Sequence, residues 1–193
     1  MLTYTNQTEA ISALKERFFI PPEHHKADAF IRQSKDFFVL RKFLETDAPL
    51  IRYPLEIEYC DGKDGWPDFI VSFNGLKVFV EVTEITDAES QRLFQGKRGT
   101  DNMGILGTID LTAAVKERVA SKNSKREQYA LRTGINQSVL LLDHNKLPPF
   151  SYGAPGDELR LDEIITSFDF TFLLAPVYET DKNYIELNRS KGD

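Results

Sequence analysis

Residues 55–85 read LEIEYCDGKDGWPDFIVSFNGLKVFVEVTEI, a stretch dominated by strand patterns. Its first six residues alternate apolar and acidic side chains, as a half-buried strand does. The segments 67–73 and 76–85 are rich in β-branched and aromatic residues, and Asn74-Gly75 between them is a strong β-hairpin signal. The stretch therefore predicts a β-meander with strands at 55–60, 67–73 and 76–85.

Helical periodicity flanks this meander on both sides. Residues 27–45 carry an apolar stripe that ends before Pro49, which predicts a helix. A second, longer helix is expected from Asp110 to about Arg132, with Gly134 as its stop.

The remaining segments complete an α/β pattern. The apolar runs 138–143 and 168–177 predict buried strands, and 161–168 predicts a short helix between them. Residues 8–19 predict an amphipathic turn of helix capped by Thr8. Together these elements predict a mixed sheet covered by helices.

Length and composition point to one ordinary globular domain of 193 residues. We expect an N-terminal extension at 1–26, a domain at 27–186 and a flexible tail at 187–193. The single cysteine, Cys60, excludes an internal disulfide framework and a Cys-rich zinc module. No apolar run is long enough to span a membrane and the N-terminus lacks a secretion-signal pattern, so we expect a cytoplasmic protein with no membrane partner.

Two acidic residues stand out in the meander. A turn at Asn74-Gly75 places Asp68 near Glu81 on the partner strand, and paired oxygen ligands on rigid strands suit Mg²⁺ or Mn²⁺. Glu81 also lies among strongly apolar neighbours, and a buried carboxylate needs a partner. Spacing alone leaves two alternatives open, a salt bridge to a lysine or an exposed strand edge.

Pro67-Asp68 followed by Glu81-Val82-Thr83, in the element order αβββαβ, resembles the PD-(D/E)xK nuclease superfamily with its restriction-endonuclease-like core. The resemblance covers roughly residues 36–143 and rests on short motifs. It implies that Asp68 and Glu81 bind Mg²⁺, or Mn²⁺ in its place, with the Val82 carbonyl as a third ligand. It also implies hydrolysis of phosphodiester bonds in DNA or RNA by a metal-activated water.

The chain departs from the family pattern at Thr83, where the family has a lysine. Some branches of the superfamily carry this lysine on the following helix, so we expect Lys122 first and Lys125 second to replace it. Both could instead belong to a solvated basic helix face. The missing lysine and the acidic composition also allow a non-catalytic nucleic-acid-binding or scaffold protein that retains the fold. An unrelated α/β binding module is a third alternative.

The family often has an acidic residue on its first helix that is directed at the metal. The candidates here are Asp36 and Glu45, with Glu23 more distant. Asp36 begins the apolar run DFFVLRKFL, which favours a role as a helix N-cap instead.

Charge is distributed unevenly along the chain. The formal net charge is −6, yet residues 90–132 contain nine Lys and Arg against four Asp and Glu. A basic segment beside a carboxylate pair suits a nucleic-acid backbone, and Lys97, Arg98 and Arg126 are the candidate contacts. Many nucleases of this superfamily act as dimers, so the resemblance is also compatible with a homodimer.

Overall fold

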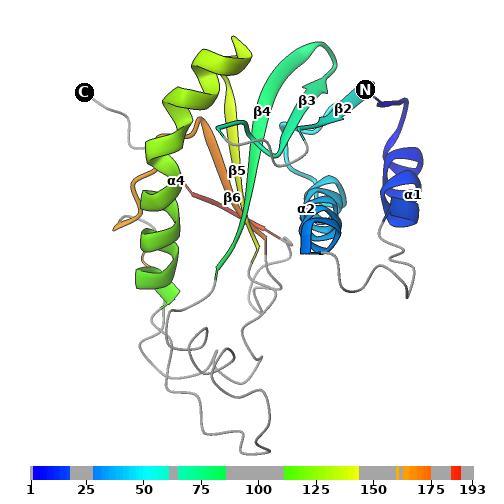
Figure 1. The fold of residues 1–193 in the computed structure, drawn as a ribbon. Helices are drawn as coiled ribbons and strands as arrows, with labels where there is room; N and C mark the ends of the chain where they lie inside the picture. The colour runs from blue at the N-terminus through cyan, green and yellow to red at the C-terminus, as the bar shows by residue number, and fades with distance from the viewer. Residues whose placement is uncertain are drawn as a thin grey trace, which may run out of the picture.

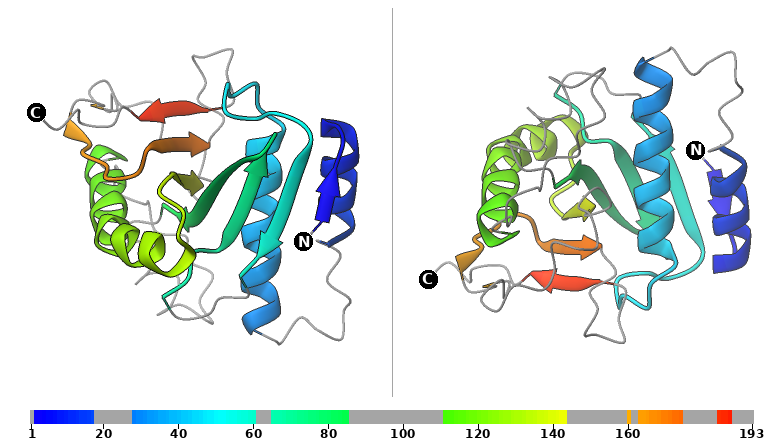
Figure 2. Two further views of the ribbon diagram at one scale, coloured as in Figure 1. Left: turned by 90° about the horizontal axis from the view of Figure 1, so that it is seen from above. Right: turned by 90° about the horizontal axis from the view of Figure 1, so that it is seen from below.

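The computed structural model describes residues 2–17, 28–60, 65–85, 111–143, 160, 163–174 and 184–187. Within these ranges, a seven-stranded sheet lies between helices α1 and α2 on one face and helix α4 on the other (Figures 1 and 2). The helices are α1 (Gln7–Arg17), α2 (Asp28–Leu44) and α4 (Leu111–Thr133). The strands are β1 (Leu2–Tyr4), β2 (Leu55–Tyr59), β3 (Phe69–Phe73), β4 (Leu76–Glu84), β5 (Ser138–Asp143), β6 (Phe170–Leu174) and β7 (Ile185–Leu187).

The strands follow one another across the sheet in chain order, from β1 to β7. β1 to β4 are antiparallel neighbours, β4, β5 and β6 are parallel, and β7 returns antiparallel to β6. Helix α4 makes the crossover between the parallel strands β4 and β5, as such a connection requires. The predicted mixed sheet covered by helices is therefore confirmed. None of the helices in these ranges is long and apolar enough to cross a membrane.

The β3–β4 hairpin forms at the predicted turn. Asn74 and Gly75 both have positive φ, 50° and 86°, which is the backbone that a two-residue hairpin loop favours. Phe69 pairs with Val80, so the next position outward places residue 68 opposite residue 81. The register expected from the sequence is confirmed.

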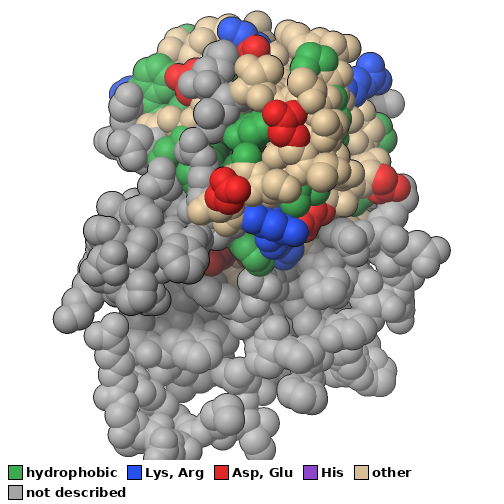
Figure 3. Space-filling view, turned by 90° about the vertical axis from the view of Figure 1, so that its right-hand side faces the viewer, with side chains coloured by type: hydrophobic (Ala, Val, Ile, Leu, Met, Phe, Trp, Pro, Cys, Tyr) green, Lys and Arg blue, Asp and Glu red, His purple; other side chains and the backbone are tan. Residues whose placement is uncertain are grey.

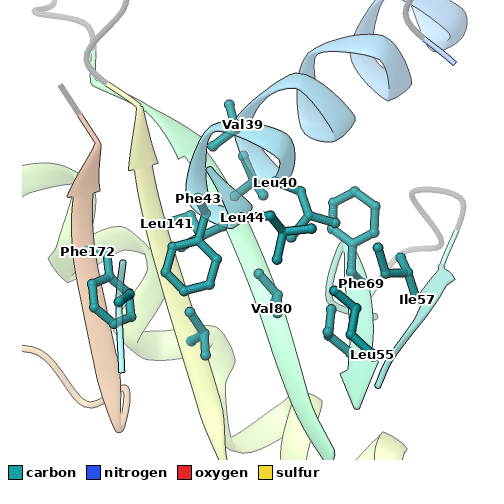
Figure 4. Close-up of a cluster of buried hydrophobic side chains, with 14 of the residues drawn as sticks. Val39, Leu40, Phe43, Leu44, Leu55, Ile57, Phe69, Val80, Leu141 and Phe172 are labelled. Carbon is teal, nitrogen blue, oxygen red and sulfur yellow. The ribbon is translucent and has the colours of Figure 1, made fainter. Parts of the chain in front are cut away.

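The larger core lies between helix α2 and the sheet (Figure 4). Helix α2 presents apolar side chains on the face that the sequence periodicity predicted, and they pack on side chains from β2 to β6. The buried residues labelled in Figure 4 are Val39, Leu40, Phe43, Leu44, Leu55, Ile57, Phe69, Val80, Leu141 and Phe172. At about 25 cal/mol per Å² of apolar surface, this burial is the main stabilising contribution on this face.

A second core lies between helix α4 and the opposite face of the sheet. Successive residues of a strand point to opposite faces. Val80 and Val82 of β4 therefore face α2, whereas Phe79 packs with Val119 and Tyr129 of α4. Glu81 shares the α4 side with Phe79, which places a carboxylate next to this apolar cluster.

The predicted N-terminal extension contributes to the domain's sheet and core. Strand β1, which the sequence analysis missed, pairs with β2, and Ala10 and Leu14 of α1 are fully buried. The helix cap is Asn6, whose Oδ1 accepts the Glu9 backbone N–H at 3.0 Å, so the assignment of Thr8 as cap was wrong. Asparagine is as good a cap as any residue and lies two positions earlier.

Two C-terminal expectations also change. The short helix predicted at 161–168 does not continue through its described part. Glu163 lies in a 3₁₀ turn, with its N–H bonded to the Arg160 carbonyl at 3.2 Å, but residues 164–168 are not helical. There, Thr166 Oγ1 accepts the Phe168 N–H at 3.2 Å and pairs with Thr171 Oγ1 at 2.8 Å. Such local side-chain bonds compete with helical ones. Leu187 of β7, assigned to the flexible tail, is buried and pairs with Thr171 of β6.

Candidate functional site

Asp68 lies immediately before Phe69, the first residue of β3. The neighbouring strand β4 extends beyond this point. The backbone carbonyl of Asp68 accepts the Cys60 N–H at 2.9 Å, and its Oδ2 accepts the Val82 N–H at 2.7 Å. The Asp68 side chain thus bonds to β4 at a position where backbone pairing between β3 and β4 has ended. These two bonds, one from the residue that follows β2 and one from β4, hold Asp68 in place beside Glu81.

Glu81 is a nearly completely buried acidic residue, with 3% of its surface exposed. Its Oε1 forms an ion pair with Lys122 Nζ on helix α4. Its Oε2 is also buried but has no hydrogen-bond partner among the residues that the structure describes. The salt bridge that the sequence left open as an alternative is therefore present for one oxygen, and the other oxygen lacks the compensation that burial demands.

Helix α4 directs Lys122 at the sheet. Val119 and Tyr129, three residues before and seven after it, are buried on the same helix face, and the Lys122 side chain is only 18% exposed. Lys125 is exposed and the structure does not bring it to Glu81. Of the two predicted lysines, only Lys122 reaches the carboxylate pair.

A neighbouring residue anchors this part of α4. Asn123 Oδ1 accepts the Ser167 N–H at 2.9 Å, and its Nδ2 donates to the Ile165 carbonyl at 3.0 Å. These bonds tie α4 to the segment that precedes β6. They fix the position of α4 relative to the sheet at the helical turn that carries Lys122.

Asp36 lies within helix α2, eight residues after its start, so the assignment of this residue as an N-cap was wrong. The apolar run begins at Asp36, but the helix begins earlier. Asp36 is near enough to Asp68 for its charge to act on that carboxyl. The other candidates differ in place: Glu45 is exposed and pairs with Arg41 at 3.6 Å, and Glu23 is outside the described residues.

Carboxyl groups dominate the electrostatics of the site. Desolvation raises the pKa of Asp68 well above its usual range, and the charges of Glu81 and Asp36 raise it further. The Val82 N–H and the charge of Lys122 lower this pKa but do not offset the increase. Without another cation, Asp68 therefore retains its proton to higher pH than a solvent-exposed aspartate does.

The candidate set of metal ligands is small. Asp68 and Glu81 provide carboxylate oxygens, and Val82 lies between Glu81 and Thr83 on β4. Thr83, at the position of the family lysine, is half-buried. Within the described ranges, no three His, Cys, Asp or Glu side chains lie close enough together to hold a metal ion by themselves. A bound ion would thus need backbone, water or substrate oxygens as well.

A second pair of acidic residues lies at the ends of the neighbouring strands β4 and β5. Glu84 of β4 lies beside Asp143 of β5, and each forms an ion pair with helix α2. Lys42 Nζ lies 2.6 Å from Asp143 Oδ1, and Lys35 Nζ lies 3.8 Å from Glu84 Oε1. The sequence did not predict these pairs, because Lys42 and Asp143 are 101 positions apart and leave no local signal.

The predicted nucleic-acid contacts are placed only in part. Lys97 and Arg98 are outside the described residues. Arg126 donates to Asp169 Oδ2 at 3.2 Å and to the Asn136 carbonyl at 3.0 Å, so it joins the segments at the start of β5 and β6. On the described part of the face shown in Figure 3, acidic and basic side chains are interspersed.

Comparisons with protein-family models, curated proteins and solved structures found no match to this chain.

Proposed function

We propose that the chain is a Mg²⁺- or Mn²⁺-dependent phosphodiester hydrolase of the PD-(D/E)xK type, acting on DNA or RNA. The observation that carries this proposal is the buried carboxylate of Glu81, opposite Asp68, with an Oε2 that has no hydrogen-bond partner within the described ranges. Burial of a carboxylate is costly unless hydrogen-bond donors or cations compensate its charge, and a metal ion is one such cation. The residues present thus fit a hard divalent ion, which prefers oxygen ligands.

Each residue has a defined role in this proposal. Asp68, Glu81 and the Val82 carbonyl would hold the ion, which when bound neutralises phosphodiester charge and lowers the pKa of water. The Val82 N–H orients Asp68, leaving its other oxygen available. Lys122 stabilises negative charge that develops on the phosphate, which is the task of the motif lysine that Thr83 cannot perform.

The acidic surroundings support a dependence on the ion. Asp68, Glu81 and Asp36 bring three carboxyl groups into one region, and Lys122 supplies the opposing positive charge. A negatively charged substrate would be repelled by such a site. A divalent ion would reverse this repulsion, so binding of substrate near the carboxylates should depend on the ion.

The alternative is a non-catalytic nucleic-acid-binding or scaffold protein that retains the nuclease fold. Thr83 favours it, because a hydroxyl group at the motif position has no positive charge. The close approach of Lys122 to Glu81 favours the enzyme. Cleavage separates the two functions, since only the enzyme turns over substrate.

The test has two stages. Mn²⁺ binding is first measured by calorimetry on the full chain, with Asp68→Ala and Glu81→Ala as test variants and Glu58→Ala, an exposed glutamate of β2, as control. Linear and supercoiled DNA and single-stranded RNA are then incubated with Mg²⁺ or Mn²⁺. We expect binding and cleavage that both site variants abolish and the control retains. Cation binding without cleavage would support the non-catalytic alternative, and its absence in wild type, with no cleavage, would reject the metal site.

A further inference from the structure

Lys122 occupies an unusual position for a residue that acts only on substrate. Its ammonium is paired with Glu81, and four fifths of its side chain is buried. The same Glu81 carboxylate is the best-placed candidate ligand for a divalent ion. Lys122 and a bound ion would therefore both interact with the same negative charge, that of Glu81.

We propose that Lys122 is the resident counter-ion of the acidic site and competes with the divalent ion for Glu81. This inference rests on the proposed function, because it assumes that Glu81 is an ion ligand. In the ion-free protein, Lys122 stabilises Glu81. When the ion binds, it weakens this pair, and the ammonium becomes available to the phosphate.

The burial of Glu81 supplies the physical reason. A carboxylate buried beside Phe79 and the α4 cluster is costly unless a cation compensates it. Removing one partner of a buried ion pair leaves the other charge uncompensated and is strongly destabilising. The fold therefore needs Lys122 as long as no ion is present.

The same charge opposes the ion. A divalent cation that binds the Asp68–Glu81 pair is placed close to the Lys122 ammonium, and like charges at this range repel. A lysine that acted only on substrate would leave the affinity for the ion unchanged. A counter-ion lowers it, which makes the two roles distinguishable without any activity measurement.

The decisive variant is Lys122→Met, which keeps most of the aliphatic stem and removes the charge. Lys116→Met is the matched control, because Lys116 also lies on α4 and pairs with a glutamate, but its partner Glu163 and its own side chain are more exposed. Mn²⁺ affinity is measured by calorimetry at one fixed pH. Thermal unfolding is followed with chelator and with Mn²⁺.

For Lys122→Met we expect Mn²⁺ affinity to rise on the order of tenfold, as removal of one nearby like charge predicts. Its melting temperature should fall below wild type in chelator and recover with Mn²⁺, whereas Lys116→Met should change neither quantity. If the variant is unfolded in chelator, refolding on addition of Mn²⁺ supports the proposal, and failure to refold overturns it. Unchanged or weaker affinity also overturns it.

The outcomes separate this inference from the proposed function. If wild type binds Mn²⁺ and Glu81→Ala abolishes the binding, the ion site stands whatever Lys122→Met does. In that case, equal affinity of wild type and Lys122→Met rejects only the competition. If neither protein binds Mn²⁺, the ion site and the competition are both rejected.

Discussion

Val82 donates its backbone N–H to Asp68 Oδ2 at 2.7 Å, so that a side chain bonds to β4 where the β3 backbone has ended. This bond holds Asp68 next to Glu81, although the two residues are thirteen positions apart in the chain. It also connects the geometry of the hairpin to the electrostatics of the site. Substitutions that alter the hairpin or the charges of the site should therefore change the stability of the metal-free protein.

The raised pKa of Asp68 predicts a pH dependence of stability. The folded protein retains a proton on Asp68 at pH values where the unfolded chain has lost it, because desolvation, Glu81 and Asp36 all disfavour the charge. This contribution is complete below the unfolded pKa of about 4 and is lost as pH rises through the folded pKa. Asp68→Asn imitates the protonated form. The free energy of unfolding of this variant, relative to that of wild type, should therefore increase as pH rises. Urea unfolding in chelator at pH 5 and pH 8 measures this difference, and a pH-independent difference would contradict the prediction.

The ion pair between Lys42 and Asp143 should be important for stability. Asp143 is 2% exposed and Lys42 Nζ lies 2.6 Å from its Oδ1, so Lys42→Met leaves a buried carboxylate without this cation. We expect a loss of about 3–5 kcal/mol in the free energy of unfolding. The control is Lys35→Met, whose pair with Glu84 is longer and more exposed and should cost less than about 1 kcal/mol. Equal losses in urea unfolding would refute the distinction.

A side chain at Gly65 should cost mainly backbone strain, because the atoms that it would meet are the ends of two flexible, exposed side chains. Its φ is +73°, and a Cβ would lie 2.5 Å from Gln128 Nε2 and 2.9 Å from Arg132 Cζ on α4. Gly75 is the matched control, since its φ is +86° but nothing lies within 4 Å of a Cβ. Both Gly75→Ala and Gly65→Ala should cost about 1–2 kcal/mol from backbone strain, with little added at Gly65 because Gln128 and Arg132 can move aside. Thermal unfolding of both variants tests this, and a clearly larger loss for Gly65→Ala would show that these two side chains are held in place.

Arg126 is expected to affect stability as well as any contact with nucleic acid. It pairs with Asp169, which also accepts the Ser138 N–H at 3.0 Å and the Ser138 hydroxyl at 2.7 Å. Arg126→Met should therefore lower the free energy of unfolding by about 1–3 kcal/mol, because hydrogen bonds to a charged group are lost. The exposed Lys125→Met should stay within about 0.5 kcal/mol of wild type. If the two variants unfold alike, the Arg126–Asp169 pair contributes nothing.

The sequence alone determined those features that depend on neighbours in the chain. Alternation of apolar residues predicted β2 to β4, Asn74-Gly75 predicted the hairpin register, and helical periodicity predicted α2 and α4. The register then placed Asp68 opposite Glu81. Local patterns sufficed here because turn geometry and side-chain alternation are themselves local.

Only the tertiary structure decided which distant groups meet. The selection of Lys122 over Lys125, the nearness of Asp36 to Asp68 and the Lys42–Asp143 pair all depend on how helices pack on the sheet. Helix packing depends on the shape and burial of many side chains at once, so it leaves no mark at any single spacing. The short strands at the two ends of the sheet were missed for the same reason: three residues carry too little pattern, and pairing with a formed sheet supplies their stability.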